Sequence, residues 1–228
     1  VNDAGDRPDI YFIMLDAYAS SRSLKNNMGF DNHEFIDYLE SQDFYIPAGG
    51  RSNYTNTTLS MASAMNMRLL DDIAALNPGD SDDPSALIEM TRNSEVMDFL
   101  RARGYKILHF KNVWMPRRDL GYEDLYVGCE RSGFFSLGGD EFSVSLIRTT
   151  VADPFLTRFG IVQDELRARR LCDFSKIPEI MRLPGPKFVF AAFSVPHPPF
   201  LCGRNGEPVR SIETSYSVWG SREQYLDQ

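Results

Sequence analysis

The sequence has few cysteines, and this excludes several classes of protein. Only three occur in 228 residues, Cys129, Cys172 and Cys202, and no Cys-x-x-Cys pair is present. They are too few and too scattered for a disulfide framework or a cysteine-rich zinc site. One bridge with one free thiol remains open, so the cysteine count does not decide between a reducing and an oxidising compartment.

Long apolar runs and an excess of positive charge are missing as well. The longest apolar block, Phe188–Val195, already contains Ser194 and falls far short of the ~20 apolar residues that span a membrane. The chain holds 24 Lys and Arg against 32 Asp and Glu, a formal net charge of -8. We therefore expect no nucleic-acid partner and no transmembrane segment in this chain. It begins at Val1 without a signal peptide, so we expect an excerpt or a processed product whose anchor lies outside it.

What is present is an alternation of apolar strand-like runs and amphipathic stretches. Hydrophobic residues make up 43% and charged residues 25%, a balance typical of globular domains. Strands are expected at 9–15, 43–47, 105–110 and 187–193, and helices at 34–41, 57–70, 94–103, 140–150 and 160–172. This alternation predicts an α/β fold with a mostly parallel central sheet and helices on both faces. We expect a linker over 1–8, an acidic loop over 77–85, and one domain over 9–228.

Polar residues stand at the ends of three predicted strands, where ligands of open parallel sheets gather. Asp16 follows the first strand, His109 lies at the end of the strand at 105–110, and His197 follows the strand at 187–193. Each has a simpler explanation. Asp16 is also a plausible cap of the next helix, and His109 a core histidine bonded to a carbonyl. The prolines on both sides of His197 stiffen its backbone and favour a functional role.

A segment rich in hydroxyl side chains, Arg51–Ser63, leads into the helix expected at 57–70. A hydroxyl nucleophile needs nearby positive charge, which a helix N-terminus and a divalent cation both supply. Taken alone, the segment is better explained as a helix N-cap rich in Ser and Thr.

Together, these stretches resemble the alkaline phosphatase superfamily, in the branch of sulfatase-like hydrolases and lipoteichoic-acid-synthase-like phosphoglycerol transferases. The resemblance covers essentially the whole chain in the order of the family. It is carried by Pro8–Tyr18, Gly29–Asp31, Phe35–Leu39, Ser52–Tyr54, Thr57–Ser60, His109, Trp114, Arg117 and Val195–Phe200.

The resemblance implies roles for particular residues. Asp16 matches the acidic metal ligand after the first strand, and Thr57 matches the nucleophile, itself bound to the metal, with Thr58 or Thr55 as alternatives. The substrate-binding residues of the family match His109, Trp114 and Arg117. Arg118 is an alternative to Arg117, because the spacing between Trp and Arg is one residue longer here. His197 matches the histidine that contacts the phosphate or sulfate group. The implied cofactor is a divalent metal ion, Mn, Zn, Mg or Ca.

Two family motifs are absent. The Cys/Ser-x-Pro-x-Arg motif of formylglycine sulfatases does not occur, and neither does the Asp-His-Gly motif that supplies further metal ligands. We therefore expect an alkaline-phosphatase-like fold that is incomplete at its C-terminus, as the N-terminal portion of the domain.

The function expected from the resemblance is metal-dependent hydrolysis or transfer at a phosphodiester or sulfate ester, on a lipid head group or polysaccharide, through a covalent threonine intermediate. Relatives work on the extracytoplasmic face of the cell membrane, tethered by segments that this chain does not contain. One alternative is a catalytically degenerate member that serves as a binding or regulatory module. The other is a structural domain without site chemistry.

Overall fold

The computed structural model describes residues 7–47, 49–73, 83–110, 125–129, 146–147, 149–209 and 220–228. Contacts divide the chain into two compact units. The first, here called the sheet unit, comprises Val1–Met14, Arg51–Gly128 and Ser175–Phe193. The second, here called the helical unit, comprises Leu15–Gly50, Cys129–Phe174 and Ser194–Gln228.

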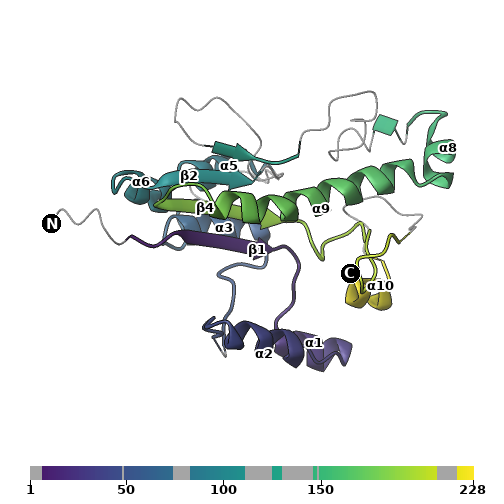
Figure 1. Cartoon of the computed structure of the whole chain (residues 1–228), viewed down its shortest axis with the longest axis horizontal. Coiled ribbons are helices and arrows are strands. Elements are labelled where there is room, and N and C mark those ends of the chain that lie inside the picture. Colours follow the sequence, from purple (N-terminus) through teal and green to yellow (C-terminus); the bar gives the residue numbers. More distant parts are fainter. Residues whose placement is uncertain are drawn as a thin grey trace. The chain divides into compact units, whose positions relative to one another are not determined.

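Four parallel strands form the sheet, and this confirms the predicted α/β fold with a parallel sheet. They are β1 (Ile10–Leu15), β2 (Lys106–Phe110), β3 (Leu125–Val127) and β4 (Lys187–Phe193). Their order is β1-β4-β2-β3, and Figure 1 shows them side by side. All seven residues of β4 are buried, because a central strand of a parallel sheet is covered on both faces.

One face of the sheet packs against α3 (Thr57–Met65) and α6 (Glu95–Arg101), and α5 (Ser85–Arg92) packs against α3. Met61 and Met65 of α3 join Met97 and Leu100 of α6 in one cluster with sheet residues. The sheet contributes Ile107, Phe188, Phe190 and Ala192 to this cluster. These side chains alternate along β4, as expected for one face of a pleated strand.

A buried lysine fixes the beginning of the sheet. Lys187, only 1% exposed, donates from Nζ to the Asp9 carboxylate and to the Leu183 carbonyl (3.0 Å). Its backbone N–H donates to Asp9 Oδ1 at 3.2 Å. The segment that enters β1 is thereby bound to the first residue of β4, and the buried ammonium has oxygen partners.

The helical unit contains α1 (Ser21–Met28), α2 (His33–Ser41), α8 (Asp153–Arg158), α10 (Arg222–Asp227) and the greater part of α9 (Ile161–Met181). Among the residues that the structure describes, two small apolar clusters lie in this unit. One gathers Ile147, Val162, Leu166 and Leu201, and the other gathers Leu24, Phe200 and Tyr225. A disulfide joins Cys129 to Cys172 of α9, and Cys202 is the free thiol.

Several expected elements differ in the structure. The strand expected at 43–47 is wrong, since this stretch pairs with no strand and Phe44 and Tyr45 are 59% and 88% exposed. The helix expected at 57–70 ends at Met65, where Asn66 caps it and Met67 has φ 50°. Conversely, the helix expected at 160–172 continues to Met181.

Other expectations fall partly or wholly outside the described residues. These are the linker over 1–8, most of the acidic loop over 77–85, and most of the helix over 140–150.

Candidate functional site

Asp16 directly follows β1 and is buried, with 7% of its surface exposed. It lies in a tight turn in which the Tyr18 N–H donates to the Leu15 carbonyl (3.2 Å) and Ala17 has φ 68°. The alternative that Asp16 caps the next helix is wrong. Ser20 is the N-cap of α1, and its side chain accepts from the Ser23 N–H at 3.3 Å.

A tyrosine from the far end of the chain holds this turn. The Tyr225 hydroxyl donates to the Ala17 carbonyl (2.9 Å) and accepts from the Ala19 N–H (3.1 Å). Burial raises the pKa of Tyr225 above its usual value, the hydrogen bond from Ala19 lowers it, and the neighbouring Tyr18 raises it. The backbone that carries Asp16 is therefore fixed from outside its own segment.

His197 follows β4 in a proline-rich segment. The Val195–Pro196 and Pro198–Pro199 peptide bonds are cis, and His197 Nδ1 lies 2.9 Å from the Pro198 carbonyl oxygen. Arg170 of α9 donates to the Pro199 carbonyl at 2.8 Å. These contacts hold the segment, and the imidazole is half-buried.

Thr57 is the first residue of α3 rather than its cap. Asn56 is the N-cap, and its Oδ1 accepts from the Leu59 N–H at 3.1 Å. Ser60 folds the preceding turn back onto the helix, since its hydroxyl donates to the Tyr54 carbonyl (2.7 Å) and accepts from the Tyr54 N–H (3.2 Å). Thr57 thus sits in the first turn, at the positive end of the helix dipole.

His109 belongs to a row of rings that crosses the sheet. Its ring stacks on Tyr126 of β3, with centroids 5.2 Å apart, and lies 6.5 Å from Phe190 of β4. Phe190 in turn stacks on Phe12 of β1 at 5.4 Å. At 2% exposure, the His109 ring lies within the core of the sheet unit, as the core-histidine alternative requires.

The predicted site residues are divided between the units. Asp16 and His197 belong to the helical unit, and Thr57 and His109 to the sheet unit. Trp114 and Arg117, with the alternative Arg118, lie outside the described residues. β1 and β4 are neighbours, so the chain leaves two adjacent parallel strands into the segments that carry Asp16 and His197.

The described residues do not fit a complete metal site. Within the ranges given above, no three His, Cys, Asp or Glu side chains are grouped as a metal requires. A divalent cation bound tightly by protein needs more ligands than one carboxylate and one hydroxyl. In the same ranges, no helix combines the length and apolar character needed to cross a lipid bilayer.

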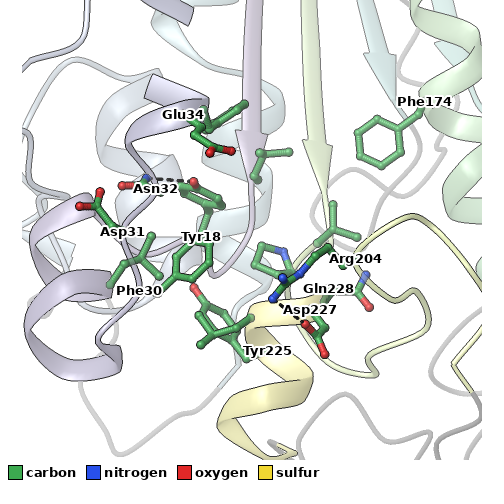
Figure 2. Close-up of a pocket in the computed structure, with 16 residues that line it drawn as sticks. Tyr18, Phe30, Asp31, Asn32, Glu34, Phe174, Arg204, Tyr225, Asp227 and Gln228 are labelled. Carbon is green, nitrogen blue, oxygen red and sulfur yellow. Dashed lines mark hydrogen bonds and ion pairs between the residues drawn. The ribbon is translucent and has the colours of Figure 1, made fainter. Parts of the chain in front are cut away.

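A cavity of about 520 Å³ lies within the helical unit, and sequence reasoning did not find it. Figure 2 shows Tyr18, Phe30, Asn32 and Glu34 on one side and Arg204, Asp227 and Gln228 on the other. Phe35, which lines it, is one of four apolar residues of α2, with Ile36, Tyr38 and Leu39, so the sequence of this helix did not single it out. The hydrogen bond from the His33 N–H lowers the pKa of Asp31, which also lines the cavity, so Asp31 is charged at neutral pH.

Comparison with protein-family models, with curated proteins and with solved structures finds no match for this chain.

Proposed function

We propose that this protein acts as a sulfatase-like hydrolase or phospho-group transferase with an alkaline-phosphatase-like sheet covered by helices on both faces. Its substrate is a phosphodiester or sulfate ester on a lipid head group or polysaccharide. One observation carries the proposal. Asp16 directly follows β1, and His197 lies four residues beyond the last residue of β4, the strand beside β1. Both therefore come after the carboxyl ends of adjacent parallel strands, where ligands of α/β enzymes bind.

Thr57 is the proposed nucleophile. Its Oγ attacks the phosphorus or sulfur atom, an O–P or O–S bond forms, and the bond to the leaving alcohol breaks. The leaving oxygen takes up a proton and the Thr57 hydroxyl loses one. Water, or an acceptor alcohol in a transferase, then cleaves the threonine ester. The first turn of α3, in which Thr57 lies, favours the negative charge that develops there.

The remaining residues have supporting roles in this proposal. His197 donates a hydrogen bond to a non-bridging oxygen of the substrate, as do Trp114 and one arginine, Arg117 or Arg118. His109, which the resemblance also matches to a substrate-binding residue, has a packing role instead, because its ring is buried in the core of the sheet unit. Asp16 and Thr57 are the residues of this chain that would bind a divalent ion, Mn, Zn, Mg or Ca, which would lower the pKa of the hydroxyl. Because the described residues hold no complete ligand set, the proposal requires donors beyond them.

The disulfide supports an extracytoplasmic location for this activity. Structural disulfides persist in oxidising compartments and are rare in the cytoplasm. Cys129 and Cys172 are bridged, and the Cys129 N–H also donates to Asp173 Oδ1 (3.3 Å), so the bridge is built into the fold of the helical unit.

A second candidate function is a binding or regulatory module that has lost catalysis. The observation that favours it is the lack of a group of metal-ligating side chains among the described residues. Such a module would bind the ester without turning it over.

Turnover by single-residue variants tests the catalytic proposal. The full chain is assayed on an aryl phosphodiester and an aryl sulfate with Mn²⁺ or Zn²⁺. We expect Thr57→Ala to lower kcat by about 10³-fold or more, because no covalent ester forms, and Asp16→Asn to raise the metal concentration required. Thr58→Ala, one residue further along α3, tests the alternative nucleophile and retains activity if Thr57 is the nucleophile.

Mass spectrometry of the stalled reaction identifies the modified residue, and a phosphoryl or sulfuryl group on Thr57 is expected. Full activity of Thr57→Ala would remove Thr57 from the mechanism. If the wild-type chain binds the esters but turns over neither with any of the four metals, the binding module replaces the enzyme.

A further inference from the structure

The cavity of the helical unit has the size of a small-molecule site. Its volume of about 520 Å³ lies within the range of roughly 300–1,000 Å³ that ligand pockets occupy. Every lining residue belongs to the helical unit, so the cavity is a property of that unit alone. Its walls are mainly apolar and aromatic, with a few polar groups between them.

Two aromatic rings of this cavity are open to a ligand. Tyr18 and Phe35 are 39% and 41% exposed, and their centroids lie 5.9 Å apart with the ring planes tilted by 58°. The Asn32 amide, which is buried, donates to the Tyr18 hydroxyl at 3.1 Å and fixes the position of that ring. Two tilted ring faces at one site attract an apolar group or a cation.

The charges in the wall favour the cation. Three carboxylates line the cavity against one guanidinium, that of Arg204, which lies 3.2 Å from Asp227. Asp31 lies near Lys25 (3.7 Å) and accepts from the His33 N–H. Glu34 has no ion pair and no hydrogen bond with any residue that the structure describes, so no cationic side chain among them neutralises its carboxylate.

We propose that this cavity binds an organic cation, an ammonium or quaternary ammonium group with a compact apolar body. The positive charge lies against the Glu34 carboxylate and the faces of Tyr18 and Phe35, and the apolar body contacts Phe30 and Val195. An anion is disfavoured, because the single cationic side chain of the wall is already paired. The inference goes beyond the proposed ester chemistry and does not depend on it.

Titration calorimetry of the full chain with matched probes tests the proposal. The probes are (4-hydroxyphenyl)trimethylammonium, its neutral isostere 4-tert-butylphenol, and the anion 4-hydroxybenzenesulfonate. We expect the cation to bind about tenfold or more tightly than the neutral probe, and the anion not to bind. Equal affinities for the cation and its neutral isostere would overturn the proposal.

Variants assign the charge preference to Glu34. Glu34→Gln is expected to weaken cation binding about tenfold and to leave binding of the neutral probe unchanged. Glu40→Gln removes the same charge from the same helix outside the cavity and is expected to change neither. If both variants weaken cation binding equally, the preference for the cation comes from the net negative charge of the protein, and the proposed site is rejected.

The rings are tested by Tyr18→Leu and Phe35→Leu, which keep an apolar side chain but remove the aromatic face. Each should weaken cation binding severalfold, whereas Tyr38→Leu, at an exposed position outside the cavity, should not. Circular dichroism confirms folding of each variant, and Glu34→Gln carries the test if a ring variant unfolds.

The source of the cation is separated by vesicles. If the protein binds phosphatidylcholine vesicles but not phosphatidylglycerol vesicles, and Glu34→Gln loses this binding, the cation belongs to a lipid head group. If the protein binds the free probe but neither kind of vesicle, the cation belongs to a soluble molecule. Ester turnover measured on Glu34→Gln separates this inference from the proposed function, because that variant should keep any activity the wild type has.

Discussion

Tyr225 lies near the end of the chain, yet it determines the backbone beside Asp16. Its hydroxyl donates one backbone hydrogen bond, to Ala17, and accepts another, from Ala19, and its ring packs on Phe200 with Leu24. A buried phenol loses solvation when it ionises, and this is the main cause of its raised pKa. The residue therefore couples the geometry of the strand-end turn to pH in the alkaline range.

Replacing Tyr225 by Phe removes both hydrogen bonds and keeps the ring. We expect the free energy of unfolding at pH 7 to fall by about 1–2 kcal/mol, because two backbone groups lose their partner. Since the folded pKa is raised, the contribution of the neutral phenol is complete below pH 10 and is lost as the pH rises through the folded pKa. Urea unfolding between pH 7 and 11 should show a smaller alkaline loss of stability for Tyr225→Phe than for wild type.

Tyr45→Phe is the matched control for this experiment, since Tyr45 is 88% exposed and should leave both stability and its pH dependence unchanged. If Tyr225→Phe behaves like Tyr45→Phe, the hydrogen bonds of Tyr225 do not stabilise the turn.

For single residues, the sequence predicts the place of a residue along a strand or helix better than it predicts which groups that residue contacts. Asp16, Thr57 and His197 lie at strand and helix ends as the apolar pattern indicates. The pattern does not show which of several neighbouring polar residues caps a helix. It therefore does not identify Ser20 rather than Asp16 as the cap of α1, or Asn56 rather than Thr57 as the cap of α3. His109 lies in a strand with both faces buried, where alternation gives no sign of which face a side chain takes.

Three helices of the sheet unit meet at one amide side chain. Asn66 caps the C-terminus of α3, and its Nδ2 donates to the carbonyls of Ala62 (2.8 Å) and Met90 (2.9 Å). Its Oδ1 accepts from the N–H of Glu95, the first residue of α6, at 3.2 Å. Two of these three hydrogen bonds connect the end of α3 to α5 and to α6, and the third closes the end of α3 itself.

Asn66→Ala should therefore lower the free energy of unfolding by about 3 kcal/mol, roughly 1 kcal/mol for each hydrogen bond lost. Asn27→Ala removes an amide that only donates to Ser23 on the exposed face of α1 and should cost less than about 0.5 kcal/mol. Chemical denaturation followed by circular dichroism measures both. Equal stabilities of the two variants would show that the junction of the three helices does not depend on Asn66.

The elements that sequence reasoning found share one property, which is a dense apolar pattern. The runs that form β1, β2 and β4 are continuous, and those of β2 and β4 are buried almost throughout. The helix α6 has a Ser94 cap whose side chain accepts from the Met97 N–H. β3 is only three residues long, and α1 is mostly polar with Leu24 as its one buried residue, so neither has a pattern to detect. The stretch 43–47 has strand composition but pairs with no strand, and composition cannot supply a partner.

For the molecule as a whole, the arrangement of distant segments was beyond sequence reasoning. The lining of the cavity comes from Leu15–Phe35, Phe174, Val195–Pro196 and Arg204–Gln228, which no local pattern joins. The same holds for the disulfide, because three cysteines allow three pairings and only the folded chain brings Cys129 within 6.1 Å of Cys172, measured between Cα atoms. Tertiary packing, rather than the spacing of residues along the sequence, determines both the lining of the cavity and the pairing of the cysteines.

The disulfide gives a prediction for the whole molecule, since it closes a loop between residues 43 positions apart. Restricting the unfolded chain by a loop of this length should stabilise the protein by about 2–4 kcal/mol. We expect reduction, or Cys129→Ser, to lower the urea midpoint accordingly, and Cys202→Ser to leave it unchanged because Cys202 forms no bridge. Alkylation without reduction, followed by peptide mapping, should label Cys202 alone. Labelling of Cys129 and Cys172 in protein purified from an oxidising compartment would contradict the bridge, and with it the support that the disulfide gives to an extracytoplasmic location.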